Sequence, residues 1–112
     1  MSALESEVRS VEIMPLVGRL DAAQAPEIRK QIDDHLKEGR TRIIFDMREV
    51  NFVDSSGLAV FVNALRNARE AGGDIAILGP TTPVRSILEL TRLHRILSIV
   101  DTQEEAVSAV TH

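Results

Sequence analysis

The chain has 112 residues, a formal net charge of −4 and no cysteine. This length suffices for one hydrophobic core and not for two, and the missing cysteine excludes disulfides, thiolate metal ligands and cysteine nucleophiles. The acidic balance and the small aromatic content, three Phe and no Trp or Tyr, argue against direct binding of nucleic acid, which needs clustered cations or stacking platforms. We expect one domain over 1–112, with its core over 3–110.

Targeting signals are missing from the sequence as given. The first residues, MSALESEVRS, lack the basic and then apolar pattern of a signal peptide. No apolar run approaches the roughly 20 residues that span a bilayer. We therefore expect a soluble, cytoplasmic protein without membrane contact, and the missing cysteine fits a reducing compartment.

Two strands are predicted at the start of the chain. A weak alternation over 3–8 indicates a first strand that forms a hairpin with the next one. The stretch 11–20, VEIMPLVGRL, is rich in β-branched and apolar residues and predicts a stronger strand. Pro15 cannot donate to a sheet ladder, so this strand should lie at an edge or carry a bulge.

The first helix is predicted over 25–37. Its apolar residues recur four apart, which is helical spacing, at Ile28, Ile32 and Leu36. Pro26 is tolerated only in the first helical turn, so the cap should fall near Gln24. Asp21 is then left in the loop after the strand, with no capping role.

A buried strand and a second helix follow. The short apolar run RIIFDM over 42–47 predicts a buried strand. After the stretch DSSG, a stripe at helical spacing predicts a helix whose core face holds Leu58, Phe61, Val62, Leu65 and Ala68. The run DIAILG over 74–79 predicts another buried strand.

The last third of the chain carries clear helix starts. Thr82 and Pro83 predict the N-cap and first residue of a third helix. A short strand is expected over 96–100. Thr102 and Glu105 have the spacing of a capping box, which predicts a terminal helix.

Strands and helices alternate through most of the chain, which predicts an α/β fold with parallel strands joined by helices. Because the two opening strands have no helix between them, we expect a mixed sheet of four to five strands, with about four helices.

The stretch DSSG, residues 54–57, has two interpretations. Asp, Ser and Gly before an apolar stripe satisfy the free N–H groups of a helix start, so it could be a plain cap. It could also be a chemical site, because sites in open α/β sheets form outside the carboxyl ends of strands. A phosphoryl group there would meet free N–H groups and the positive end of the helix dipole. We assign the cap to Ser56, which leaves Ser55 projecting outward.

Asp21 is a second candidate. A loop carboxylate is commonly just solvated, but Asp21 follows a strand of the predicted sheet. If the two strands lie parallel, Asp21 and Ser55 should come close together at one edge.

The side of the second helix opposite its core stripe is small and neutral. Such a face could let a partner approach closely beside Ser55, or it could be half-buried under a neighbouring helix. It holds Ala59, Val60, Asn63, Ala64 and Asn67.

With these motifs in place, the chain resembles the STAS domain, and more narrowly the bacterial anti-sigma factor antagonists. The resemblance covers nearly the whole chain, in the stretches LVGRLDAAQAPEIRKQI, IIFDMREVNFVDSSGLAVFVNALRNAREAGGDIAILGP and PVRSILELTRLHRILSI. In such proteins the serine directly after the aspartate is phosphorylated by a partner that is both anti-sigma factor and kinase. The resemblance makes Ser55 the phosphorylation site and matches Asp21 and Asp54 to the family's acidic positions.

The chain departs from the family pattern at three places. Gln24 stands where a Thr cap is frequent, Ala59 where Gly is common, and Thr91–Arg92 where Ser-Gly or Thr-Gly is common. None touches the phosphorylation motif, so these differences bear on which partner binds rather than on the mechanism.

The resemblance implies a protein-binding switch without catalytic activity and without a cofactor. Unphosphorylated, it would dock on an anti-sigma factor/serine kinase and free a sigma factor; phosphorylation at Ser55 would release it, and a serine phosphatase would reset it. We expect a monomer or weak dimer. The expected contact residues are Asp21, Asp54, Ser55, Ser56, Gly57, Val60 and Ala64.

Two other functions stay open. One is a STAS subunit or scaffold of a transport or signalling assembly, whose serine only caps a helix. The other is a small enzyme that uses Asp54 and Ser55 directly. Against enzymes, the chain has no G-x-S-x-G elbow, P-loop or G-x-G-x-x-G motif. His35 and His94 lack partners at metal-ligand spacing.

Overall fold

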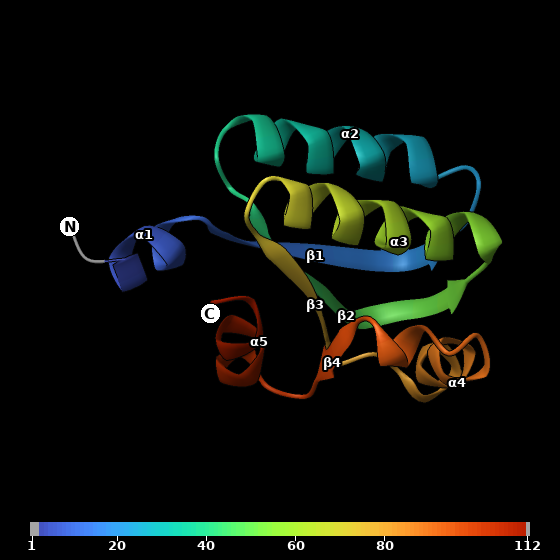
Figure 1. The fold of residues 1–112 in the computed structure, drawn as a ribbon. Helices are drawn as coiled ribbons and strands as arrows, with labels where there is room; N and C mark the ends of the chain where they lie inside the picture. The colour runs from blue at the N-terminus through green and yellow to red at the C-terminus, as the bar shows by residue number, and fades with distance from the viewer. Residues whose placement is uncertain (1–2, 112) are drawn as a thin grey trace.

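The computed structural model describes residues 3–111. Its elements in chain order are α1 (Ala3–Arg9), β1 (Val11–Leu20), α2 (Ala25–Lys37), β2 (Arg42–Val53), α3 (Ser55–Glu70), β3 (Asp74–Leu78), α4 (Thr82–Leu90), the short 3-10 helix η1 (Leu93–Arg95), β4 (Ser98–Val100) and α5 (Gln103–Val110). The strands form one sheet in the order β1-β2-β3-β4, and all three pairs are parallel. Figure 1 shows α2 and α3 side by side above the sheet and α5 below it. The buried α4 residues Val84 and Leu88 belong to the same core as those of α2 and α3.

The α/β class and the four strands are confirmed, whereas the mixed sheet is wrong. The segment expected to be an opening strand over 3–8 belongs to α1. Its residues Ala3, Leu4, Glu5 and Glu7 are strong helix formers, and their propensity outweighs the weak alternation. With five α-helices among the described residues, the chain also has one more than expected.

Strand β1 lies at the edge of the sheet, as Pro15 predicted. The pairing with β2 shifts register between Pro15 and Val17, so the strand is irregular where proline cannot donate. The Val17 side chain is exposed there.

The centre of the sheet is buried on both faces. In β2, Ile43 and Phe45 face the larger core beneath α2 and α3, while Ile44 faces a smaller core with α5. The Phe45 ring packs against Phe61 of α3, with ring centroids 5.2 Å apart. Burial on both faces explains why the run reads as continuously apolar rather than alternating.

The starts of the last two helices differ in how well the sequence predicted them. The N-cap of α4 is Thr81, one residue before the expected Thr82. The Thr81 hydroxyl donates to the Val50 carbonyl at 2.9 Å, so it ties the helix start to β2. At α5 the predicted start is confirmed, because Thr102 is the N-cap and its hydroxyl accepts a hydrogen bond from the Glu105 N–H at 3.2 Å.

Candidate functional site

Strands β1 and β2 end side by side. Leu20 and Val53, their last residues, are register partners. The Asp54 N–H donates to the Leu20 carbonyl at 3.1 Å, which joins the two loop starts. Asp21 and Ser55 therefore lie at the same end of the sheet, where α2 and α3 begin (Figure 1).

Gly57 lets the first turn of α3 sit against the end of β1. A Cβ added to Gly57 would lie 2.5 Å from the Leu20 carbonyl oxygen and 2.9 Å from the Val53 Cγ1. Both distances are too short for any side chain, so only glycine permits this approach. The glycine of the DSSG stretch thus sets the position of the serines before it, and it is itself buried.

The helix cap is Asp54, and the expectation that Ser56 caps α3 is wrong. The Asp54 backbone is extended, and its Oδ1 accepts a hydrogen bond from the Gly57 N–H at 3.1 Å. This is N-cap geometry, and the negative charge also suits the positive end of the helix dipole. Ser55 and Ser56 already lie inside the helix. The Ser55 side chain is exposed, whereas Ser56 is half-buried.

Asp21 has a local structural role that the sequence did not predict. Its Oδ1 accepts hydrogen bonds from the N–H groups of Ala23, at 3.1 Å, and Gln24, at 3.3 Å. It therefore caps the turn that precedes α2, while Gln24 takes the N-cap position as expected. These bonds hold the carboxylate at the edge where α3 begins.

Arg19 is a site residue that sequence reasoning missed. Its Nε lies 3.5 Å from the Asp21 Oδ2, and its Cζ lies 4.0 Å from the centroid of the Phe52 ring. Arg19 and Phe52 are register partners on β1 and β2. The sequence shows that Arg19 stands two residues before Asp21, which could have marked it as a possible ion-pair partner. Its contact with the Phe52 ring depends on the strand register, which the sequence does not show.

The small face of α3 is not the exposed surface that the sequence suggested. Val60 and Ala64 are each 2% exposed. They line the same surface hollow as Ile32 of α2, so the alternative interpretation, burial under a neighbouring helix, is the correct one. Small side chains here let the two helices approach closely. Val62, which was expected in the core stripe, is instead 38% exposed on the outer side of α3, so that part of the prediction is wrong.

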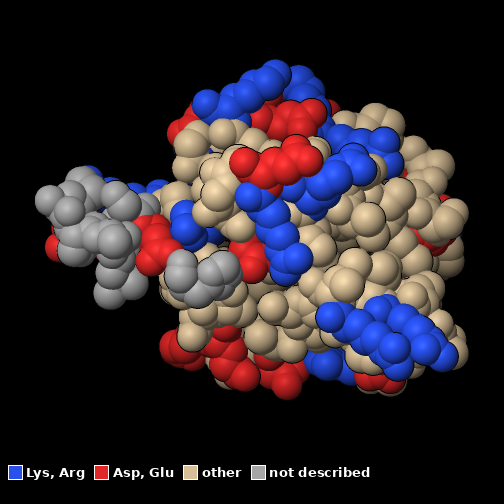
Figure 2. All heavy atoms as spheres, viewed as in Figure 1, with Lys and Arg blue, Asp and Glu red and all other residues tan. Residues whose placement is uncertain are grey.

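Few charged residues surround the start of α3 in the view of Figure 1. In Figure 2, Lys and Arg gather over α2, over the later turns of α3 and over the α4 region, while mostly neutral residues cover the end where α3 begins. Within residues 3–111 no group of three or more His, Cys, Asp or Glu is arranged to hold a metal. In the same range, no helix has both the length and the apolar character to cross a bilayer.

Comparison with known proteins defines the class. The family model of the STAS domain matches residues 5–106, and the chain therefore belongs to the STAS domain family. An anti-sigma-B factor antagonist of Listeria monocytogenes is 31% identical over 91 residues, which cover 80% of this chain and 79% of that protein. The resemblance found in the sequence is confirmed.

Solved structures agree with this family. A crystal structure of a Thermotoga maritima protein, named provisionally as an anti-sigma factor antagonist, has a TM-score of 0.85 and 33% identity, covering 92% of this chain and 89% of that one. The anti-sigma factor antagonist SpoIIAA in unphosphorylated form has a TM-score of 0.75 and 27% identity, covering 85% and 83%. The phosphorylated form of Bacillus SpoIIAA has a TM-score of 0.70 and 26% identity, covering 90% and 91%.

Proposed function

We propose that this chain is an anti-sigma factor antagonist that works by partner switching in the cytoplasm. Unphosphorylated, it docks on an anti-sigma factor that is also a serine kinase, and a sigma factor is freed. The kinase then phosphorylates Ser55, which ends the interaction, and a serine phosphatase restores the binding form. The observation that carries this proposal is the exposed Ser55 directly after the capping Asp54.

The first turn of α3 suits a phosphorylated serine. Because Asp54 supplies the cap, the Ser55 hydroxyl is not needed to hold the helix start. A phosphate on the first helical residue would lie near free N–H groups and the positive end of the dipole. Ser56, half-buried one residue later, is less accessible to a kinase.

Electrostatic repulsion accounts for release without a change of fold. A phosphoserine carries about −1.5 to −2 charges at neutral pH. This charge would be added to those of Asp21 and Asp54, which follow the carboxyl ends of β1 and β2. Like charges brought together in a desolvated interface cost on the order of several kcal/mol, and about 1.4 kcal/mol weakens binding tenfold.

The test uses this chain and each purified anti-sigma factor kinase encoded by the same genome, with ATP. Mass mapping should place the phosphate on Ser55. Ser55→Ala should stay folded, take no phosphate and remain bound, whereas Ser55→Asp should bind at least tenfold more weakly. Asp21→Ala should keep the fold yet weaken binding or slow phosphorylation.

Ser56→Ala is the matched control, because it removes the neighbouring hydroxyl and should still be phosphorylated. Phosphate on Ser56 would overturn the site assignment. Binding of a partner that never phosphorylates the chain would instead support a STAS subunit or scaffold whose serine carries no phosphate.

A further inference from the structure

We propose that Arg19 is the resident cation of the phosphorylation site. It pairs with Asp21 while Ser55 is unmodified and moves to the phosphate once Ser55 carries one. This inference rests on the proposed function for its phosphate, and it adds a residue and a rearrangement to that site.

Arg19 lies at the end of the sheet where α3 begins, because its guanidinium pairs with Asp21 in the loop after β1. Arg19 precedes Leu20, whose carbonyl faces Gly57 in the first turn of α3. Stacking on the Phe52 ring keeps the guanidinium at this end of the sheet, while 60% of the Arg19 side chain stays exposed. An arginine over an aromatic face keeps its hydrogen-bond donors available at the edges of its plane.

The pair between Arg19 and Asp21 is easy to open. The Nε–Oδ2 distance of 3.5 Å is longer than the roughly 2.7–2.9 Å of a charge-assisted hydrogen bond. Exposed ion pairs of this kind add little stability. Asp21 would remain in place without the arginine, because its other oxygen accepts two backbone N–H bonds.

A phosphate on Ser55 would compete well for this arginine. It carries more negative charge than a carboxylate and three acceptor oxygens, and the planar guanidinium can bind two of them at once. Within residues 3–111, Arg19 is the only Lys or Arg in the last two positions of the four strands and the loops that follow them.

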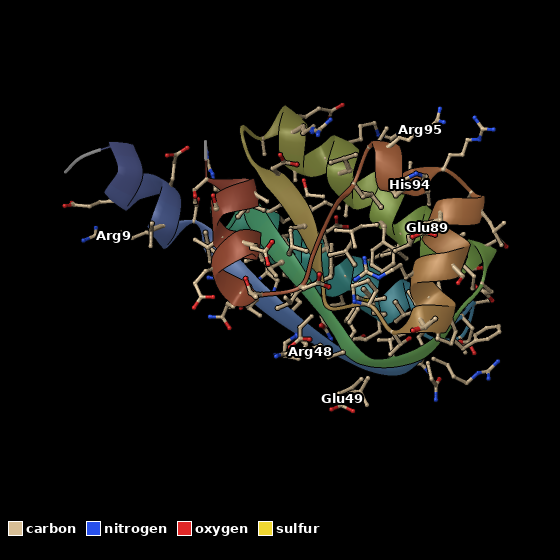
Figure 3. The ribbon with its side chains drawn as sticks, turned by 90° about the horizontal axis from the view of Figure 1, so that it is seen from below. Arg9, Arg48, Glu49, Glu89, His94 and Arg95 are labelled. Carbon is tan, nitrogen blue, oxygen red and sulfur yellow. The ribbon has the colours of Figure 1, made fainter. Side chains whose placement is uncertain are left out.

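Two arginines outside these positions are already paired with carboxylates. Arg48 of β2 donates to both carboxylate oxygens of Asp46, at 3.0 and 2.7 Å, and these hydrogen bonds hold the pKa of Asp46 below its ordinary value. Figure 3 shows Arg48 and Glu49 together on β2. Arg85 of α4 donates to Asp101 at 2.8 Å.

The rearrangement would change what a partner meets. Before phosphorylation, Arg19 partly neutralises Asp21. Afterwards the arginine would neutralise part of the phosphate, and the Asp21 carboxylate would face the partner uncompensated. Phosphorylation would therefore add one negative group and uncover another.

The test places phosphoserine at position 55 during translation, so no kinase is needed. The second pKa of the phosphate is then measured by phosphorus NMR in the unsubstituted chain, Arg19→Gln and Arg66→Gln. A neighbouring cation favours the dianion, so Arg19→Gln should raise this pKa by about 0.2–0.7. Arg66→Gln, which removes an exposed arginine from a later turn of α3, should leave it unchanged.

A second readout follows the arginine itself. The Arg19 Nε–H resonance should move when Ser55 is phosphorylated, whereas that of Arg66 should not. Compared with Arg19→Gln, Arg19→Lys should lower the phosphate pKa part of the way back, because lysine keeps the charge without the planar guanidinium. If Arg19→Gln fails to fold, the Nε–H shift in the unsubstituted chain serves as the test. Equal phosphate pKa values with and without the Arg19 cation would overturn the inference.

The inference and the proposed function can fail separately. If kinases ignore Ser55 but the installed phosphate still engages Arg19, the proposed function fails and the arginine assignment stands. If Ser55 is phosphorylated normally and its phosphate pKa is insensitive to Arg19, only the present inference fails.

Discussion

Two carboxylates hold the backbone at neighbouring strand ends. Asp54 accepts the Gly57 N–H, and Asp21 accepts the N–H groups of Ala23 and Gln24. The Ser55 hydroxyl is therefore spared from capping. At the scale of single residues, the groups that stabilise the site differ from the group proposed to be modified.

Asp54→Ala should destabilise the protein by about 1 kcal/mol, because it removes the cap of α3. The melting temperature should fall by about 3–6 °C. Asp54→Asn should retain most of the stability, since asparagine caps as well as aspartate.

Ser56→Ala is the control for the cap and should change the melting temperature by less than half as much. Thermal unfolding followed by circular dichroism measures all three variants. A larger loss for Ser56→Ala than for Asp54→Ala would contradict the cap assignment.

Helix α3 packs on two elements at once. Phe61, Leu65 and Ala68 lie in the core over the sheet, and Val60 and Ala64 are buried beside α2. The apolar surface of α3 is therefore wider than the single stripe in its sequence. At the scale of elements, the helix that carries Ser55 is packed against both the sheet and α2, while Ser55 and the outer side of the helix stay exposed.

Ala64→Arg should destabilise the fold by at least about 3 kcal/mol, because it forces a charge and extra volume between α2 and α3. Urea unfolding measures the free energy of unfolding. The matched control is Val62→Arg on the outer side of the same helix, which should change stability by less than about 0.5 kcal/mol. Equal stability of the two variants would show that Ala64 is not enclosed.

Helix α1 extends away from the rest of the molecule (Figure 1). Arg42 connects it to the sheet. The Arg42 guanidinium donates to the Ser10 hydroxyl at 2.9 Å, to Glu7 at 3.3 Å and to the Gly72 carbonyl at 3.2 Å. Arg42 is the first residue of β2, at the end of the sheet opposite Ser55. At the scale of the whole molecule, the attachment of α1 and the proposed switch are therefore separate.

Arg42→Met should loosen α1 and leave the phosphorylation site intact. Hydrogen exchange at the amides of 7–10 should speed up more than exchange over 43–47, because the bonds to Glu7 and Ser10 are lost. The rate of Ser55 phosphorylation should stay unchanged. Faster exchange spread evenly over both segments would instead show that Arg42 supports the whole fold.

The sequence by itself determined the features that depend on near neighbours. The apolar runs at 11–20, 42–47 and 74–79 lie in strands. Short continuous runs of apolar and β-branched residues favour strands over helices. Pro26 and the capping box at Thr102 marked helix starts because their chemistry acts within one turn.

Only the tertiary structure decided what lies over each face. The small side of α3 with Val60 and Ala64 could have faced solvent or a neighbouring helix, and the structure shows that α2 covers it. Arg19 meets Phe52 through strand register. Local patterns encode which side a residue faces, but the neighbour on that side comes from distant segments whose pairing no short stretch specifies.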